Sequence, residues 1–133
     1  MTGIMRVEGF CVNGDGPYSL GVCHSLALWG GSLVDQEGKT VAMVNPIGGW
    51  LGEDGGGVYV DELRIASRTP IAVAGGDAEG RRWRKATTRR QADVLRLTSG
   101  HVLCDAKSGE AVAEFDGSSW RLPDADTELV ILD

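Results

Sequence analysis

The residues best suited to chemistry are two histidines and three cysteines: His24, His101, Cys11, Cys23 and Cys104. Nitrogen and sulfur ligands of this kind could hold a tetrahedral zinc ion. However, the paired C-x-x-C knuckles typical of structural zinc sites are absent. Cys23 and His24 are also neighbours in an expected strand, so their side chains point to opposite faces. We therefore predict three free thiols, no metal site and no other cofactor.

The sequence supports a catalytic nucleophile no better than it supports a metal site. A Cys–His pair meets the same geometric objection and lacks a third group to orient the base. Ser118, Ser119 and the scattered carboxylates form no recognisable triad or acid pair. The expectation is that the protein is not an enzyme. Cys11 and Cys23 flank a Gly-rich turn and could face each other across a hairpin, but an odd cysteine count argues against a disulfide framework.

A basic segment, residues 81–96, is the strongest binding candidate. It holds seven of the thirteen basic residues and one acid, Asp93. Its net charge is +6, which leaves −12 for the rest of a chain whose total is −6. Such a dipolar pattern guides association with an oppositely charged partner. The predicted partner-binding residues are Arg81, Arg82, Trp83, Arg84, Lys85, Arg89 and Arg90.

The expected partner is a protein, which implies a homo-oligomer or a capsid-like lattice. A sequence pI of about 4.8 and the single aromatic in the segment argue against nucleic acid. Residues 45–57 contain six glycines and are expected to form an exposed loop. They lack the spacing of a phosphate-binding loop and the alternating carboxylates of a calcium loop.

Two stretches of the chain echo each other, residues 26–50 and residues 95–120. With small gaps, paired leucines, single glycines, a Val-Ala dipeptide and a closing Trp align. The matched pairs are Leu26 with Leu95, Leu28 with Leu97, Gly31 with Gly100, Gly38 with Gly109, Val41 with Val112, Ala42 with Ala113 and Trp50 with Trp120. Each stretch predicts a strand, a tight hairpin entered at Asp and left at Gly, and a second strand. The sequence thus indicates a possible internal duplication of a hairpin unit.

The rest of the chain also reads as short strands between turns. Residues 6–12 alternate in polarity, residues 18–29 form one bent strand or two, residues 58–66 are strand-like, and residues 128–132 end the chain as a buried strand. At most a turn or two of helix is expected, near residues 87–93. These patterns predict a single all-β domain over residues 1–133, a small sandwich or barrel of roughly eight to ten short antiparallel strands.

One short motif has a counterpart elsewhere. The run V-D-E-L-R-I at residues 60–65 resembles a stretch near the end of laminin-G-like and other concanavalin-like lectin domains. It covers under ten residues, and too little chain precedes it for the usual sheets of that fold. No carbohydrate-binding residue is therefore carried over.

These features favour a non-enzymatic structural or assembly protein, above all a phage virion component such as a head-decoration or other small capsid or tail protein. The alternative is a small β binding module that recognises a carbohydrate or inhibits a host protein for a phage. No run approaches the length of a membrane span, and residues 1–8 lack the apolar core of a signal peptide. The expected location is the virion, or otherwise the cytoplasm.

Overall fold

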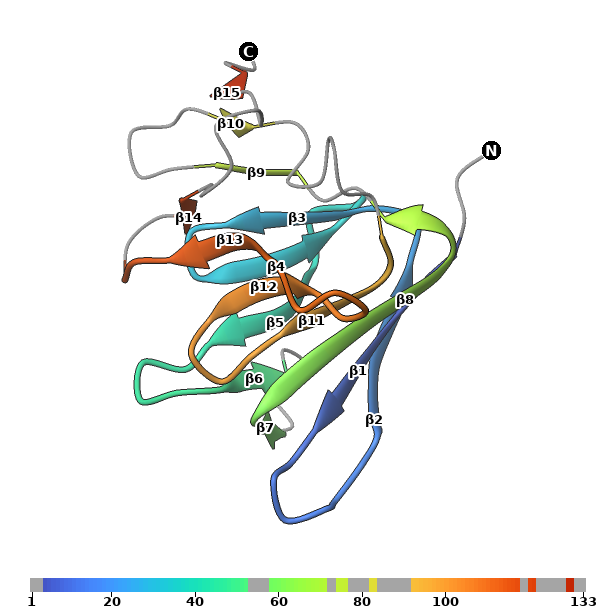
Figure 1. Cartoon of the computed structure of the whole chain (residues 1–133), viewed down its shortest axis with the longest axis vertical. Helices are drawn as coiled ribbons and strands as arrows, with labels where there is room; N and C mark the ends of the chain where they lie inside the picture. The colour runs from blue at the N-terminus through green and yellow to red at the C-terminus, as the bar shows by residue number, and fades with distance from the viewer. Residues whose placement is uncertain are drawn as a thin grey trace.

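The fold is an all-β sandwich in which two sheets enclose one apolar core (Figure 1). The structure, a computed structural model, describes residues 4–52, 58–71, 74–76, 82–83, 92–117, 120–121 and 129–130. These residues form fifteen strands and no helix. The described part of the chain therefore contains no helix long and apolar enough to cross a membrane. The all-β prediction is confirmed as an open sandwich and not a closed barrel. The expected eight to ten strands were too few.

Sheet A, the seven-stranded sheet, has the order β14-β13-β12-β11-β8-β1-β2. Its strands are β1 (Met5–Phe10), β2 (Tyr18–Cys23), β8 (Glu62–Ile71), β11 (Ala92–Leu97), β12 (Val102–Asp105), β13 (Ala111–Phe115) and β14 (Trp120–Arg121). All its pairs are antiparallel. Asp93 lies within β11, so the helical turn expected near it is not present at residues 92–93.

Sheet B, the eight-stranded sheet, has the order β15-β10-β9-β3-β4-β5-β6-β7. Its strands are β3 (Leu26–Trp29), β4 (Ser32–Asp35), β5 (Thr40–Val44), β6 (Trp50–Gly52), β7 (Tyr59–Val60), β9 (Ala74–Gly76), β10 (Arg82–Trp83) and β15 (Leu129–Val130). The pair β3–β9 is parallel, whereas the other pairs of this sheet are antiparallel.

The chain changes sheets inside two stretches that look continuous in the sequence. Residues 18–29 form two strands that separate after Cys23, because β2 lies in sheet A and β3 in sheet B. Residues 58–66 break at Asp61, between β7 and β8. The expectation of an exposed loop over residues 45–57 was wrong for residues 50–52. They form β6, and Trp50 is fully buried.

The two echoing stretches form matching four-stranded meanders. The first runs β3-β4-β5-β6 in sheet B and the second runs β11-β12-β13-β14 in sheet A. Val41 and Val112, predicted to be equivalent, are both buried. Each meander has a bulge at the same point, after Leu33 in one and after Leu103 in the other. The predicted repeat is therefore present as a structural repeat, with one copy in each layer of the sandwich.

The hairpin turns of the two meanders also match. In the first, Asp35 Oδ1 accepts hydrogen bonds from the backbone N–H groups of Glu37 and Lys39. In the second, Asp105 Oδ1 accepts from those of Lys107 and Ser108. Gly38 and Gly109 leave the turns at φ of 79° and 78°, a left-handed conformation that glycine adopts at little cost. The Asp-to-Gly hairpin prediction is confirmed for both copies.

Two tryptophans join the layers reciprocally. Trp50 Nε1 donates to the carbonyl oxygen of Thr98 at 3.2 Å, in the loop after β11. Trp120 Nε1 donates to the carbonyl oxygen of Gly30 at 2.8 Å, in the loop after β3. The two rings stack with centroids 6.3 Å apart and planes 13° from parallel. Each meander thus inserts its closing Trp against the first loop of the other.

Candidate functional site: the arginine face of sheet A

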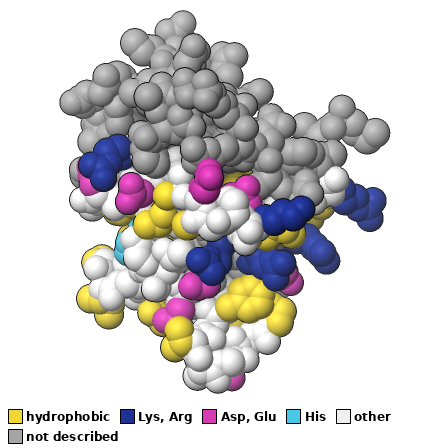
Figure 2. Space-filling model, in the orientation of Figure 1, with side chains coloured by type: hydrophobic (Ala, Val, Ile, Leu, Met, Phe, Trp, Pro, Cys, Tyr) yellow, Lys and Arg dark blue, Asp and Glu magenta, His cyan; other side chains and the backbone are white. Residues whose placement is uncertain are grey.

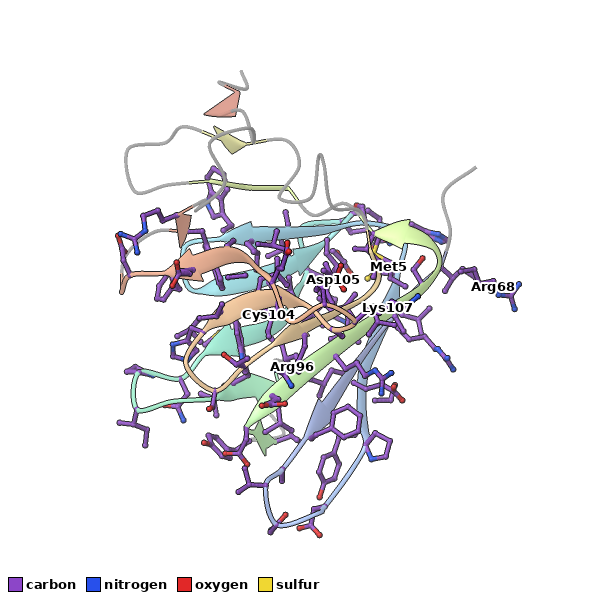
Figure 3. The ribbon with its side chains drawn as sticks, in the orientation of Figure 1. Met5, Arg68, Arg96, Cys104, Asp105 and Lys107 are labelled. Atoms are coloured by element: carbon purple, nitrogen blue, oxygen red, sulfur yellow. The ribbon has the colours of Figure 1, made fainter. Side chains whose placement is uncertain are left out.

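The outer surface of sheet A carries four arginines, and we call this surface the arginine face. Strand alternation places it there: the row Val7, Ile65 and Leu95 is fully buried, so the next row points outward. The arginines are Arg6 on β1, Arg64 and Arg68 on β8, and Arg96 on β11, and all four are exposed. Basic side chains gather on the face shown in Figure 2, and Figure 3 labels Arg68 and Arg96.

Arg64 and Arg96 are directly opposite each other on neighbouring strands. Glu8 faces Arg64 from the other side, on β1. Arg64 and Arg96 carry like charges, and like charges directly opposite each other destabilise a sheet. Among the described residues, no ion pair joins Arg64 or Arg96 to a carboxylate. Arg64 thus has no carboxylate at ion-pairing distance among the described residues, and Arg96 hydrogen-bonds the side chain of Cys104 on its other side.

A hollow of about 450 Å³ lies beside this arginine pair. Its lining residues are Phe10, Glu62, Leu63, Arg64, Arg96 and Ala106. The turn after β12 forms one wall, because the backbone N–H of Ala106 donates to the carbonyl oxygen of Val94 at 3.1 Å. Phe10 supplies an apolar surface next to the two cations. The hollow is lined by two guanidinium groups and one carboxylate, that of Glu62, so its net charge is positive. This balance favours a carboxylate-bearing side chain, which guanidinium binds in a bidentate manner.

Glu8, Arg64, Arg96 and Cys104 lie in one row across four strands of sheet A. Cys104, on β12, is directly opposite Arg96. Burial raises the pKa of the Cys104 thiol, and the nearby Arg96 guanidinium acts in the opposite direction. The side chain of Cys104 is 7% exposed. A buried thiol with a raised pKa is a poor nucleophile, which is consistent with a packing role for this cysteine.

Most of the predicted partner-binding residues lie outside the described residues. These are Arg81, Arg84, Lys85, Arg89 and Arg90. Arg82 and Trp83 form β10, which pairs with β9 and β15 in sheet B. Arg96, at the end of the basic segment, belongs to the arginine face of sheet A. Within the described structure, the basic residues that meet on one face thus come mainly from other parts of the sequence.

Sequence reasoning missed Arg6, Arg64 and Arg68 because it searched for basic residues close together in the chain. The available signal was strand periodicity. In β1, Arg6, Glu8 and Phe10 alternate with buried positions, and in β8 the alternating outward positions begin Glu62, Arg64, Ala66. Which strands become neighbours, and in what register, was not readable from that alternation.

The histidines and cysteines are dispersed. Cys23 lies opposite Met5, at the far end of the β1–β2 hairpin from Cys11, so these two cysteines do not face each other as the sequence suggested. His24 is exposed. The described residues contain no group of three His, Cys, Asp or Glu side chains placed to hold a metal ion.

His101 has a structural position. Its Nε2 lies 2.9 Å from the carbonyl oxygen of Gly49, and its ring contacts Trp50 edge to face with centroids 5.4 Å apart. It also packs against Phe115. His101 has a φ of 60°, uncommon for a residue other than glycine. These contacts help to fix the loop after β11 against sheet B.

Comparison with known proteins identifies no relative of this chain: no family model, no curated protein and no solved structure matches it.

Proposed function

We propose that this protein is a non-enzymatic assembly protein that binds an acidic protein surface through the arginine face. The observation that supports this proposal is the pair Arg64 and Arg96, directly opposed on adjacent strands and without a carboxylate ion-pair partner among the described residues. Arg6 and Arg68 extend the same surface. Arginine is among the residues enriched in binding hot spots.

A neighbouring copy is the first acidic surface to consider. The chain carries 19 acidic residues against 13 basic ones, so much of its remaining surface attracts a basic face. Repeated contacts between such faces build a lattice. The activity that fits is that of a virion component, such as a head-decoration or other small capsid or tail protein of a phage. The overall charge of −6 disfavours a nucleic acid as the partner.

Sedimentation velocity of the purified protein tests this proposal. The average mass should be larger at about 0.1 M salt than at about 1 M, because the screening length falls from about 10 Å to about 3 Å. The double reversal R64E/R96E should remove this salt-dependent association. The matched control V12E/I47E/R121E makes the same change in net charge at three exposed positions off both the arginine pair and the β2 edge, and it should associate like the wild type.

The proposal fails if the wild-type mass does not change with salt, or if R64E/R96E associates normally. Binding of a single-stranded oligonucleotide tests the alternative that the partner is a nucleic acid. If the wild type and V12E/I47E/R121E bind it and R64E/R96E does not, the arginine face belongs to a nucleic-acid-binding protein instead.

A further inference from the structure

The two sheets have four edge strands, and one of them differs from the others. Strands β14, β7 and β15 each contain two residues, whereas β2 contains six. Edge strands expose unpaired backbone groups that can pair with another chain, and proteins commonly protect them by keeping them short or by adding charge or proline. Among the described strands, β2 is the one edge long enough to serve as a pairing template.

The sequence of β2 offers little protection. It reads Y-S-L-G-V-C and contains no charge and no proline. Its pairing with β1 includes an irregularity next to Leu20, which is its one protective device. Val22 is 63% exposed and Tyr18 is 38% exposed. In the described structure β2 hydrogen-bonds as a strand to β1 alone, so its other edge is open.

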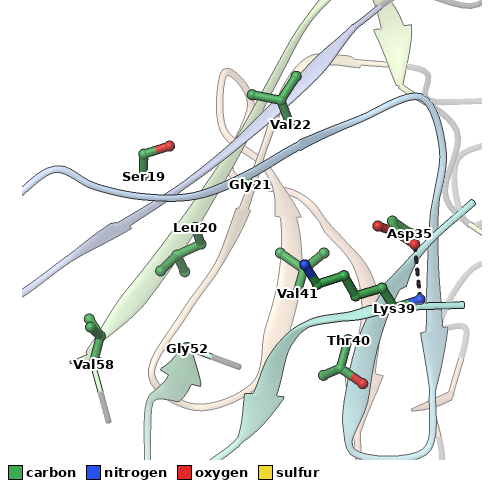
Figure 4. A pocket seen from close by; sticks show the side chains of 10 residues that line it. All are labelled: Ser19, Leu20, Gly21, Val22, Asp35, Lys39, Thr40, Val41, Gly52 and Val58. Atoms are coloured by element: carbon green, nitrogen blue, oxygen red, sulfur yellow. Dashed lines mark hydrogen bonds between the residues drawn. The ribbon is translucent and has the colours of Figure 1, made fainter. Parts of the chain in front are cut away.

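A groove of about 280 Å³ runs beneath this open edge, between β2 and sheet B (Figure 4). Leu20 from β2, Val41 from β5 and Val58 contribute its apolar lining. Asp35 and Lys39 line it at the turn between β4 and β5. A strand added beside β2 would place its inward-facing side chains over this groove, as in recognition by strand addition.

We infer that β2 pairs with β2 of a second copy, antiparallel across a two-fold axis, and joins two sheets A into one. A two-fold interface needs a self-complementary surface. The uncharged β2 meets this requirement because no like charges oppose each other when it pairs with itself. This inference does not rest on the proposed function, since β2 is an edge and the arginine pair lies on a face.

Full overlap of the two six-residue strands selects the register, because Tyr18 then faces Cys23 of the second copy and every residue of β2 is paired. Arg6 lies opposite Val22, and Glu8 lies opposite Ser19. If Ser19 pairs with Val22 of the second copy, one row across the joined sheet carries Glu8 from one copy and Arg6 from the other. These two charges are three strand spacings apart, about 14 Å, so they are compatible with this register but contribute little to it. The inferred register is therefore Ser19 against Val22 and Leu20 against Gly21.

The first test is the mass of the wild type at about 1 M salt, where the face-to-face attraction proposed above is screened. A dimer of twice 14.1 kDa is expected there. V22K places a charge on the edge and should raise the dimer dissociation constant by at least about tenfold. The matched control I47K makes the same apolar-to-lysine change at a side chain that is 92% exposed and should remain dimeric.

The second test fixes the register by crosslinking. In a Cys11→Ser background, S19C/V22C should form a covalent dimer under mild oxidation, because directly opposed residues have Cα atoms about 4.5–5.5 Å apart, within disulfide range. Either single variant, S19C or V22C, should not. A monomeric wild type at high salt would overturn the inference and leave an extended peptide of another protein as the occupant to seek. A dimer that resists V22K, or that S19C/V22C does not crosslink, would also overturn it.

Discussion

Replacing Trp50 or Trp120 by Phe removes the indole N–H that joins the two layers of the sandwich. Each indole donates to a loop carbonyl of the opposite meander. A lost hydrogen bond of this kind costs about 0.5–1.5 kcal/mol, and an acceptor left unpaired in a buried site adds to this. The smaller ring also buries less apolar surface, at about 25 cal/mol per Å². We expect each single variant to lose about 2–3 kcal/mol of unfolding free energy.

The structural repeat makes a stricter prediction, which is that the two losses are similar. Trp50 is fully buried and Trp120 is 3% exposed, and both rings belong to one stack. Because the rings are in contact, the double variant W50F/W120F should depart from additivity by about 0.5–1.5 kcal/mol.

Urea unfolding of the wild type, both single variants and the double variant, followed by far-UV circular dichroism, gives the four free energies. The reasoning would be refuted if one substitution cost less than about 0.5 kcal/mol while the other cost several, since the two positions would then not be equivalent. Strictly additive losses would show that the stacked rings do not cooperate.

Two further predictions concern the core and the thiols. Val41→Ala and Val112→Ala should each lower the free energy of unfolding by about 1–3 kcal/mol, because each deletes buried methyl groups and leaves a cavity. Met43→Ala, on the exposed face of β5, should lower it by less than about 0.5 kcal/mol. Urea unfolding measures all three variants, and a valine whose replacement has no effect would contradict the equivalence of the meanders. A thiol reagent at about pH 8 should modify the half-buried Cys11 well before the buried Cys23. Burial raises the pKa of Cys23 to about 11, with a smaller contribution from the nearby Asp35. Only a small fraction of the Cys23 thiol is therefore ionised and reactive at this pH. Rapid labelling of Cys23 in the folded protein would contradict its buried position.

The sequence by itself determined the local structure of this protein. Alternating polarity identified β1, and the Asp-to-Gly turns at Asp35 and Asp105 identified two hairpins, because these signals act over a few neighbouring residues. The echo between residues 26–50 and residues 95–120 predicted matching units. Both observations led to an all-β domain, and the structure agrees.

Only the tertiary structure decided how these local units meet. The breaks after Cys23 and at Asp61 depend on which sheet each strand joins, and a continuous apolar run does not encode that choice. The buried position of Trp50 within a Gly-rich stretch depends on the opposite layer that covers it.

The candidate site shows the same division. Arg6, Arg64 and Arg96 lie far apart in the chain, and strand order and register bring them onto one face. The open edge of β2 likewise exists because no later strand pairs beside it among the described residues. Strand alternation told which side chains would point outward, but pairing between distant strands, a non-local property, decided which of them became neighbours.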